Sequence, residues 1–240
     1  MEIFYIPDII DNTEWVTITG AEAKHITKVL RHKAGDELFG TDGRGNEFRL
    51  RIEQTRGTTI ICRIVEKKTG RREPKHRLAL AQALLKGDKL SQVVEGATEV
   101  GVNEIIPFVS KRVIGKMGET KRRRLEKVAI SGMKSSLRTV LPKIGEVVDI
   151  LRLLKRFAEF SQVLVAYEEE KETGLAQVLK RDIQSLLLIV GPEGGFTDDE
   201  IKQMKEAGAI PFTLGPRRLK AETAALVVSS LCLGLLGDLG

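Results

Sequence analysis

Cysteine is scarce in this sequence, and histidine is confined to its first third. Cys62 and Cys232 stand far apart, so the chain has no CxxC spacing from which thiolates could build a zinc site. The three histidines are His25, His32 and His76. The remaining two thirds therefore offer no imidazole as a general base or metal ligand. This excludes the usual serine hydrolase and metallohydrolase sites there, and we expect no metal.

Long hydrophobic runs are also missing. No stretch of about 18 apolar residues occurs, and the N-terminus carries Glu2 and Asp8 instead of a basic region before an apolar core. With so few cysteines, we expect a cytoplasmic protein that is neither exported nor membrane-spanning. The net charge of +6 favours a polyanionic partner. A surface that is basic only for solubility would give the same balance.

The chain changes character near residue 70. Up to that point it consists of short segments rich in β-branched residues, and the clearest hairpin loop is 42–46. This pattern is typical of a small antiparallel barrel or sandwich. The charged segment GRREPKHR that follows contains proline and lacks apolar periodicity, as a linker does. We therefore place a β domain at 1–70, a linker at 71–76 and a second domain at 77–240.

One helix interrupts the β-rich region, over residues 21–33. Its spacing predicts that Ile26, Val29 and Leu30 share one face, with basic residues around them. These basic side chains could bind phosphate groups or could simply be solvated.

The second domain shows strand and helix patterns in alternation. The apolar run LALAQALL, residues 78–85, is typical of a strand buried on both faces. Asp88 then opens an amphipathic helix that Gly101 ends, and further helices are predicted over KRRRLEKVAISGMKSS and around 149–160. The alternation predicts an α/β fold with a mostly parallel sheet covered by helices.

Three late segments share one pattern, in which an apolar strand runs into a tight loop and then a helix: 162–174, 186–200 and 210–224. In a parallel sheet such loops gather at the carboxyl ends of the strands, where ligands bind. The middle loop, GPEGG, needs glycine for a close approach of backbone or ligand, although a plain turn is the alternative. Its spacing fits neither a Walker loop nor a dinucleotide-binding motif. Thr197 and Glu200 are predicted to form a capping box.

The last helix, 224–236, is apolar almost all round and is not expected to face water. It should pack beneath the sheet, against a second subunit, or both. We favour a homodimer.

These segments also carry a resemblance. IVGPEGGFTDDE together with LGPRRLKAETAAL resembles the paired signature of the SPOUT methyltransferases, specifically the family called ribosomal RNA small subunit methyltransferase E. HITKVLRHKAGDEL resembles the family's PUA-like N-terminal barrel, and ALLKGDKLSQVVEGATEVGVNEIIPF its central segment. Ser136, Arg138 and Pro142 match an SxRxxxP pattern. The similarity covers nearly the whole chain.

Three positions depart from the family pattern. The family commonly has Gln at Ser135, Leu at Val100 and Arg at Lys220. The change at Ser135 loosens any catalytic or RNA-binding role for that position. Lys220 keeps the charge but loses the planar guanidinium.

The resemblance implies a small PUA-like β-barrel followed by a SPOUT α/β domain, with a deep trefoil knot in about 162–224. It also implies methylation of N3 of a specific uridine in 16S ribosomal RNA, in the decoding region of the small subunit, and a homodimer formed through the knotted domain. S-adenosylmethionine would lie bent among the three loops. The alternatives are a SPOUT enzyme acting on another RNA or on a 2′-hydroxyl, or an RNA-binding protein without catalysis.

The resemblance assigns cofactor binding to residues in and beside these loops, namely Tyr167, Glu168, Val190, Gly191, Gly194, Gly195, Leu214, Gly215, Leu219 and Thr223.

The chemistry suggests the catalytic candidates. N3 of uracil is a protonated imide nitrogen, so a base or stabilisation of the imide anion is required. Without histidine in this domain, the candidate bases are Glu193 and Glu222. Arg138 and Arg217 are candidates to stabilise the negative charge on O2 or O4. Glu193 could instead only brace its turn, and Glu222 could only stabilise a helix N-terminus.

RNA binding is expected from the β domain and from basic helices. The target uridine must be unpaired or flipped out for N3 to be reached. The candidate RNA contacts are Lys24, His25, Arg31, Lys86, Arg122 and Arg123.

Overall fold

The computed structural model describes residues 2–10, 13–113 and 117–239. It forms two compact units. The first consists of Met1–Glu73 and Met133–Leu141, and the second of Pro74–Gly132 and Pro142–Gly240. The first unit thus takes in part of the expected linker and a distant segment of the chain. The domain boundaries drawn from the sequence stay a prediction.

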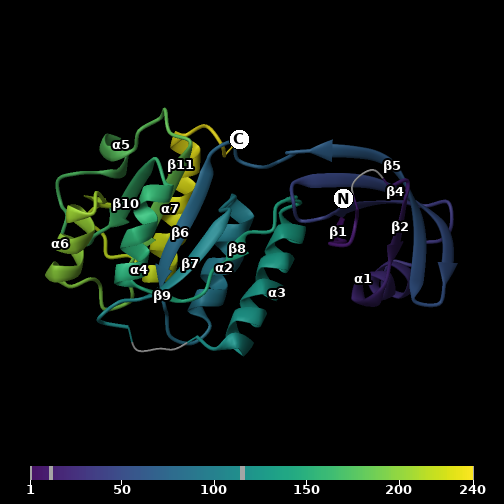
Figure 1. The fold of residues 1–240 in the computed structure, drawn as a ribbon, viewed down its shortest axis with the longest axis horizontal. Coiled ribbons are helices and arrows are strands. Elements are labelled where there is room, and N and C mark those ends of the chain that lie inside the picture. Colours follow the sequence, from purple (N-terminus) through teal and green to yellow (C-terminus); the bar gives the residue numbers. More distant parts are fainter. Residues whose placement is uncertain (1, 11–12, 114–116, 240) are drawn as a thin grey trace. The chain divides into compact units, whose positions relative to one another are not determined.

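The first unit is built on a five-stranded sheet in the order β1-β3-β4-β5-β2 (Figure 1). Its strands are β1 Ile3–Tyr5, β2 Trp15–Ile18, β3 Glu37–Thr41, β4 Asn46–Arg56 and β5 Thr59–Thr69. The neighbours pair antiparallel, except that β1 and β3 are parallel. This exception departs from the all-antiparallel prediction. It arises because the chain visits β2, at the opposite edge of the sheet, between β1 and β3.

The helical segment of this unit differs from the prediction. It consists of α1, Gly20–Lys24, followed by a π-helical turn, His25–Val29, in which the N–H of Leu30 donates to the carbonyl of His25 over 3.0 Å. Ile26 is buried, whereas Val29 is 67% exposed and Leu30 is 37% exposed. The shared apolar face was therefore wrong, because the wider π turn rotates these two residues away from Ile26.

The predicted hairpin loop is confirmed between β3 and β4. The side-chain carboxylate of Asp42 accepts a hydrogen bond from the N–H of Arg44 at 2.8 Å, which stabilises the turn. The distant segment 133–141 packs against this loop: the N–H of Gly45 donates to the carbonyl of Thr139, and the N–H of Leu141 to that of Gly43, both over 2.9 Å.

The buried carboxylate of Glu73, which follows β5 in the chain, is hydrogen-bonded to the same segment, 133–141. The Glu73 side chain accepts two hydrogen bonds from the guanidinium of Arg138, over 2.6 and 3.0 Å. It also accepts the backbone N–H of Thr139 over 2.6 Å and that of Val140 over 2.9 Å. The side chains of Arg138 and Glu73 are only 3% and 7% exposed. Part of the expected linker is therefore built into the first unit.

The second unit contains a sheet in the order β12-β10-β11-β6-β7-β8, with β9 also beside β7. Every strand pair found among its described residues is parallel. The strands are β6 Arg77–Ala83, β7 Glu104–Val109, β8 Lys143–Ile144, β9 Val148–Asp149, β10 Gln162–Ala166, β11 Ser185–Val190 and β12 Ile210–Phe212. The predicted parallel α/β sheet is confirmed.

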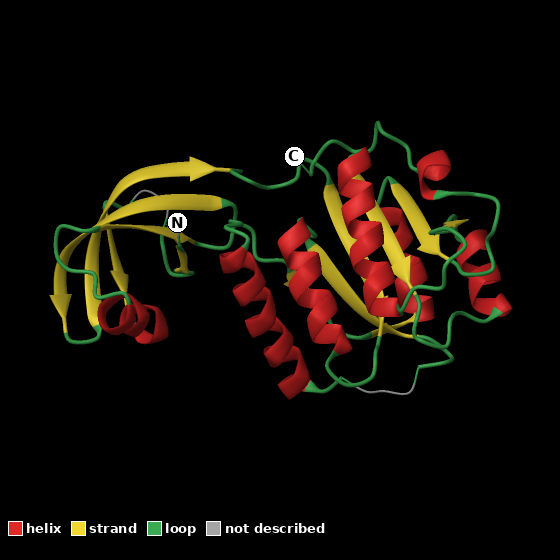
Figure 2. Cartoon of the chain, turned by 180° about the vertical axis from the view of Figure 1, so that it is seen from behind, coloured by secondary structure: helices red, strands yellow, loops and turns green. Residues whose placement is uncertain are grey.

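Helices cover both faces of this sheet. They are α2 Lys89–Val100, α3 Glu119–Ser135, α4 Ile150–Lys155 with a following 3₁₀ turn, Arg156–Glu159, then α5 Leu175–Val178, α6 Asp198–Glu206 and α7 Ala221–Leu235. The helices α2 and α7 lie together across one face (Figure 2), and α4 lies across the other (Figure 1). The helix α2 begins directly after Asp88 and ends at Gly101, as predicted. Within the described residues, no helix is long and apolar enough to cross a bilayer.

Candidate functional site

Three loops meet at one edge of the parallel sheet. The strands β12, β10 and β11 are neighbours and point the same way, so the loops that follow them leave from the same edge. Together with the start of α7 and Lys89 of α2, they line a cavity of about 740 Å³. A cavity of this size suits a cofactor or a small substrate.

Most of the residues predicted for this site line the cavity: Tyr167, Glu168, Val190, Gly191, Glu193, Gly195, Leu214, Gly215, Arg217 and Leu219. Gly194, Thr223 and Glu222 are close in sequence to lining residues but do not line it themselves. Arg138 belongs to the first unit and is not part of the lining. The ligand-binding and catalytic roles of all these residues stay predictions.

The glycines of the middle loop are required for two different reasons. Gly195 has a φ of +69°, and a β-carbon there would also meet the carboxylate of Glu168. Gly191 has an ordinary backbone, but a β-carbon would lie 3.0 Å from the ring of Phe196. Gly195 therefore sets the turn, and Gly191 lets the ring of Phe196 pack beneath the loop.

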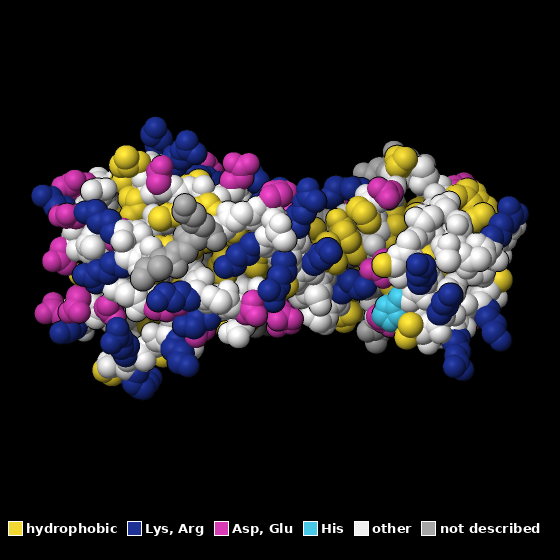
Figure 3. Space-filling model, turned by 90° about the horizontal axis from the view of Figure 1, so that it is seen from below, with side chains coloured by type: hydrophobic (Ala, Val, Ile, Leu, Met, Phe, Trp, Pro, Cys, Tyr) yellow, Lys and Arg dark blue, Asp and Glu magenta, His cyan; other side chains and the backbone are white. Residues whose placement is uncertain are grey.

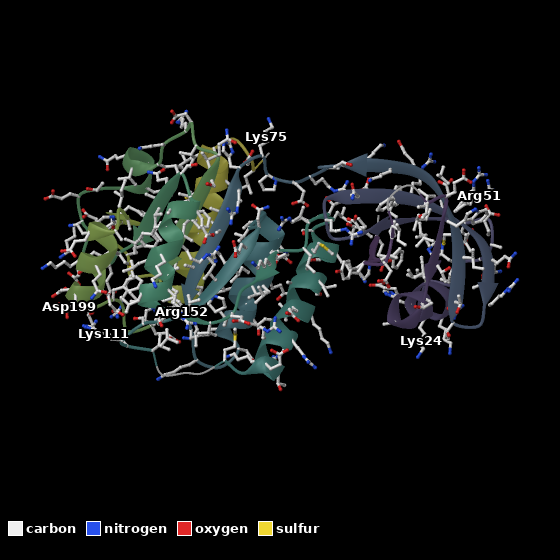
Figure 4. The ribbon with its side chains drawn as sticks, in the orientation of Figure 1. Lys24, Arg51, Lys75, Lys111, Arg152 and Asp199 are labelled. Carbon is white, nitrogen blue, oxygen red and sulfur yellow. The ribbon has the colours of Figure 1, made fainter. Side chains whose placement is uncertain are left out.

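A capping box fixes the end of this loop, as predicted. The N–H of Thr197 donates to the Glu200 carboxylate over 2.9 Å, and the N–H of Glu200 donates to Oγ1 of Thr197 over 3.3 Å. Glu200 also accepts the N–H of Lys111 over 2.7 Å. The side chain of Lys111 reaches the same helix, since its Nζ lies 3.0 Å from the carboxylate of Asp199 (Figure 4). Burial raises the pKa of Glu200, but the hydrogen bonds that it accepts outweigh burial and hold the pKa below its ordinary value.

Lys89 is a lining residue that sequence reasoning missed. Its Nζ lies 3.1 Å from Oε1 of Glu193 and 3.9 Å from Oε2 of Glu222, so it joins both candidate bases. The only available signal was its position directly after Asp88 at the start of an amphipathic helix. A helix start does not reveal which distant loop it will face.

The two carboxylates differ in their surroundings. Burial raises the pKa of Glu193, but hydrogen bonds from its own backbone, from Lys89 and from the N–H of Lys86 bring the pKa below its ordinary value. Oε2 of Glu222 is buried and has no hydrogen-bond partner among the described residues, apart from the ion pair with Lys89. Glu193 is therefore well stabilised as an anion, whereas the buried Oε2 of Glu222 lacks a hydrogen-bond donor among the described residues.

The cations of the third loop are open to solvent. Arg218 lies 3.8 Å from the carboxylate of Glu168 and is 79% exposed. Arg217 is exposed and makes no ion pair with any described residue. The cavity thus combines apolar side chains, glycine backbone and charges of both signs. Such a lining suits an amphipathic ligand that carries charged groups. Across the described ranges, no cluster of His, Cys, Asp or Glu side chains is arranged to hold a metal ion.

The predicted RNA contacts belong to both units. In the first unit, Lys24 and Arg31 are exposed, and His25 lies 3.6 Å from Glu2. Lys and Arg side chains are visible over the surface of this unit in the space-filling view (Figure 3). In the second unit, Lys86 is exposed beside the cavity. Two further candidates on α3, Arg122 and Arg123, are bound by Glu119, and Arg122 also by Glu126. Much of the α3 charge is therefore neutralised locally.

Comparisons with known proteins match both units. The family described as RNA methyltransferase domain matches residues 71–233, and the family described as RNA methyltransferase PUA domain matches residues 18–65.

Named relatives give the same result. The chain is 31% identical to ribosomal RNA small subunit methyltransferase E of Bacillus subtilis, over 92% of this chain and 90% of the relative. It is 36% identical to the protein of the same name from Mesomycoplasma hyopneumoniae, over 71% and 75%. A crystal structure of ribosomal RNA small subunit methyltransferase E from Neisseria gonorrhoeae, bound to S-adenosylmethionine, superposes with a TM-score of 0.88 at 25% identity, over 98% of both chains. The chain therefore belongs to the RNA methyltransferase family whose members carry the name ribosomal RNA small subunit methyltransferase E.

Proposed function

We propose that this protein transfers a methyl group from S-adenosylmethionine to N3 of a uridine in 16S ribosomal RNA. The observation that carries the proposal is the cavity formed by three strand-end loops, in a chain of the RNA methyltransferase family. A relative in this family has been crystallised with S-adenosylmethionine. The uridine specificity comes from the resemblance of the sequence.

The lining of the cavity fits this cofactor. The side chains of Val190 and Leu219 offer apolar contact to an adenine ring, and the glycine loops offer backbone groups to the ribose and amino acid parts. The anion of Glu168 and the cation of Arg218 match the mixed charges of the ligand. When bound, S-adenosylmethionine would supply an electrophilic methyl group next to the target base.

The chain's own side chains would make N3 nucleophilic. Glu193, whose pKa is lowered, is a poor proton acceptor, and we assign it to hold Lys89 in place. Glu222 is then the candidate to accept the N3 proton, because its buried oxygen has no hydrogen-bond donor. The unpaired guanidinium of Arg217 would stabilise the negative charge that develops on the uracil oxygens.

Two measurements test the proposal. Calorimetric titration with S-adenosylmethionine should show saturable binding, and no binding up to millimolar concentration would favour an RNA-binding protein without catalysis. Nuclease digestion of methylated 16S RNA followed by mass spectrometry should give 3-methyluridine. A methyl group on the ribose 2′-hydroxyl, or on a different RNA only, would overturn the assigned acceptor.

The role of Glu222 is tested separately. Glu222→Gln should lower the rate of methyl transfer without weakening cofactor binding, whereas an unchanged rate would remove Glu222 as the base.

We also propose that two copies of the chain associate through α7. Leu231 of this helix is 46% exposed and Leu239 just beyond it is 50% exposed. Exposed leucines on such an apolar helix are costly unless a partner covers them. Light scattering after gel filtration should give twice the chain mass, and Leu231→Glu should give the mass of one chain. A single-chain mass for the unaltered protein would contradict the dimer.

A further inference from the structure

Three exposed side chains form a row across the outer face of the first unit's sheet. The strand register places Trp15 of β2 opposite Arg63 of β5, and Arg63 opposite Arg51 of β4. Trp15 is 51% exposed, and both arginines are exposed as well. Figure 4 shows Arg51 on the outer side of the curved sheet, well apart from Lys24 of α1. We refer to Trp15, Arg63 and Arg51 as the outer row.

The outer row stands on a rigid support. The residues that follow its members along their strands, Val16 and Ile52, are buried beneath the sheet, and so is Cys62, the neighbour of Arg63. Strand alternation therefore fixes the outer row outward. A large aromatic side chain left half in solvent on a well-packed sheet is not needed for the core.

The two arginines are electrostatically available. Neither Arg51 nor Arg63 makes an ion pair with any residue in the described part of the chain. The carboxylate that continues the row, Glu37, lies 3.3 Å from the guanidinium of Arg49 instead. Glu53 is the other exposed acid next along β4. The outer row thus presents one indole ring beside two unpaired positive charges.

We propose that the outer row is a stacking platform for an unpaired nucleotide of the RNA substrate. The indole of Trp15 would stack on the base, and the guanidinium groups of Arg63 and Arg51 would bind the neighbouring phosphates. An aromatic ring beside cations on an exposed sheet is a common way to bind single-stranded RNA, whereas a duplex hides the faces of its bases. A protein partner would need a wider apolar surface than one indole. The inference rests on the proposed function only in that the substrate is RNA.

Trp15 makes the test direct, because the chain contains a single tryptophan. The full-length protein is titrated with a uridine-rich oligoribonucleotide of about ten nucleotides, free or annealed to its complement, while the tryptophan fluorescence is recorded. We expect the single strand to quench the fluorescence and the duplex to leave it nearly unchanged. Equal quenching by both would overturn the stacking proposal, and so would quenching that follows protein concentration instead of RNA concentration.

Variants separate stacking from charge. Fluorescence anisotropy of labelled single-stranded RNA should show affinity lowered about tenfold by Trp15→Ala, and by less than about threefold by Trp15→Phe. The double change Arg51→Ala with Arg63→Ala should reduce the slope of log affinity against log salt by about 1.4. Arg56→Ala, at the β4–β5 turn outside the row, is the charge control and should leave the slope nearly unchanged. Unchanged affinity in Trp15→Ala would exclude the platform.

Failure of this inference is distinguishable from failure of the proposed function. The cofactor cavity lies in the second unit, so Trp15→Ala should leave the Kd for S-adenosylmethionine unchanged. Quenching by RNA without any cofactor binding would support the platform and contradict the methyltransferase. Normal cofactor binding and methyl transfer in Trp15→Ala, at unchanged RNA affinity, would support the methyltransferase and contradict the platform.

Discussion

Two regions of the molecule use arginine in opposite ways. In the cavity loops, Arg217 is exposed and unpaired, next to glycine backbone and a large open volume. In the segment that completes the first unit, Arg138 is buried and donates two hydrogen bonds to Glu73, which also accepts two backbone N–H groups. A guanidinium that is already saturated stabilises the fold, whereas a free one is available to a ligand. The contrast gives the two arginines separate, testable roles.

The largest effect is expected at Arg138. Arg138→Ala would leave the Glu73 carboxylate buried without its charged partner, and should lower the free energy of unfolding by about 3 to 5 kcal/mol. Urea denaturation followed by circular dichroism measures this change. Arg217→Ala serves as the exposed control and should stay within about 0.5 kcal/mol. Equal free energies of unfolding in the two variants would contradict the structural role assigned to Arg138. A folded Arg138→Ala protein without methyl transfer would restore a catalytic role for Arg138.

A large effect on activity is expected at Arg217. Arg217→Ala removes a cation from the cavity, and should lower kcat about 100-fold if it stabilises the uracil anion. Single-turnover methylation assays at saturating cofactor measure the chemical step. Arg217→Lys keeps the charge without the planar donors and should recover part of the rate. An unchanged kcat with a raised KM for RNA would place Arg217 in binding only.

Gly195 should show a smaller effect. In Gly195→Ala the backbone must keep a φ of +69°, at a cost of roughly 1 to 2 kcal/mol, and the new β-carbon displaces the Glu168 carboxylate. We expect the Kd for S-adenosylmethionine to rise about tenfold. Gly118→Ala is the matched control, because no atom lies near its β-position and its φ is ordinary. Equal affinities in both variants would show that the loop turn is not needed for cofactor binding.

The smallest effect concerns acid stability. The folded pKa of Glu193 is lowered, so its ionised form contributes stability that is present above the unfolded value and is lost as pH falls through the folded value. The gap in Tm between the unaltered protein and Glu193→Gln should therefore narrow as pH falls from neutral through the ordinary value of 4.5 and below. Scanning calorimetry across this range measures it. A gap that widens in acid would contradict the assigned direction.

The parts of the fold that repeat a local pattern could be predicted from the sequence. The buried strand before Asp88, the Thr197–Glu200 capping box and the helix–strand alternation each depend on neighbours in sequence. The strand-end loops could be placed together because parallel strands share an edge. These predictions are confirmed by the sheet and by the lining of the cavity. The knotted path over 162–224 and the roles of the lining residues stay predictions.

The parts that depend on distant contacts could not be predicted. No local pattern links Glu73 to Arg138, which are 65 positions apart, or Lys89 to Glu193, which are 104 apart. The π turn after α1 also gives no signal, because its residues suit an α-helix equally well. For that reason Val29 was expected beside Ile26 and is exposed instead.

The segment 133–141 has a consequence for how the protein is made. Residues 1–73 leave a ribosome first, but Gly43 and Gly45 then lack the backbone partners that Leu141 and Thr139 provide. The N-terminal unit is therefore completed only after the 59 residues Pro74–Gly132 of the next unit have been synthesised. During that interval the backbone groups of the β3–β4 loop can hydrogen-bond only to solvent. An isolated fragment ending at residue 73 should behave as this nascent chain does, less stable than the same unit in the full protein.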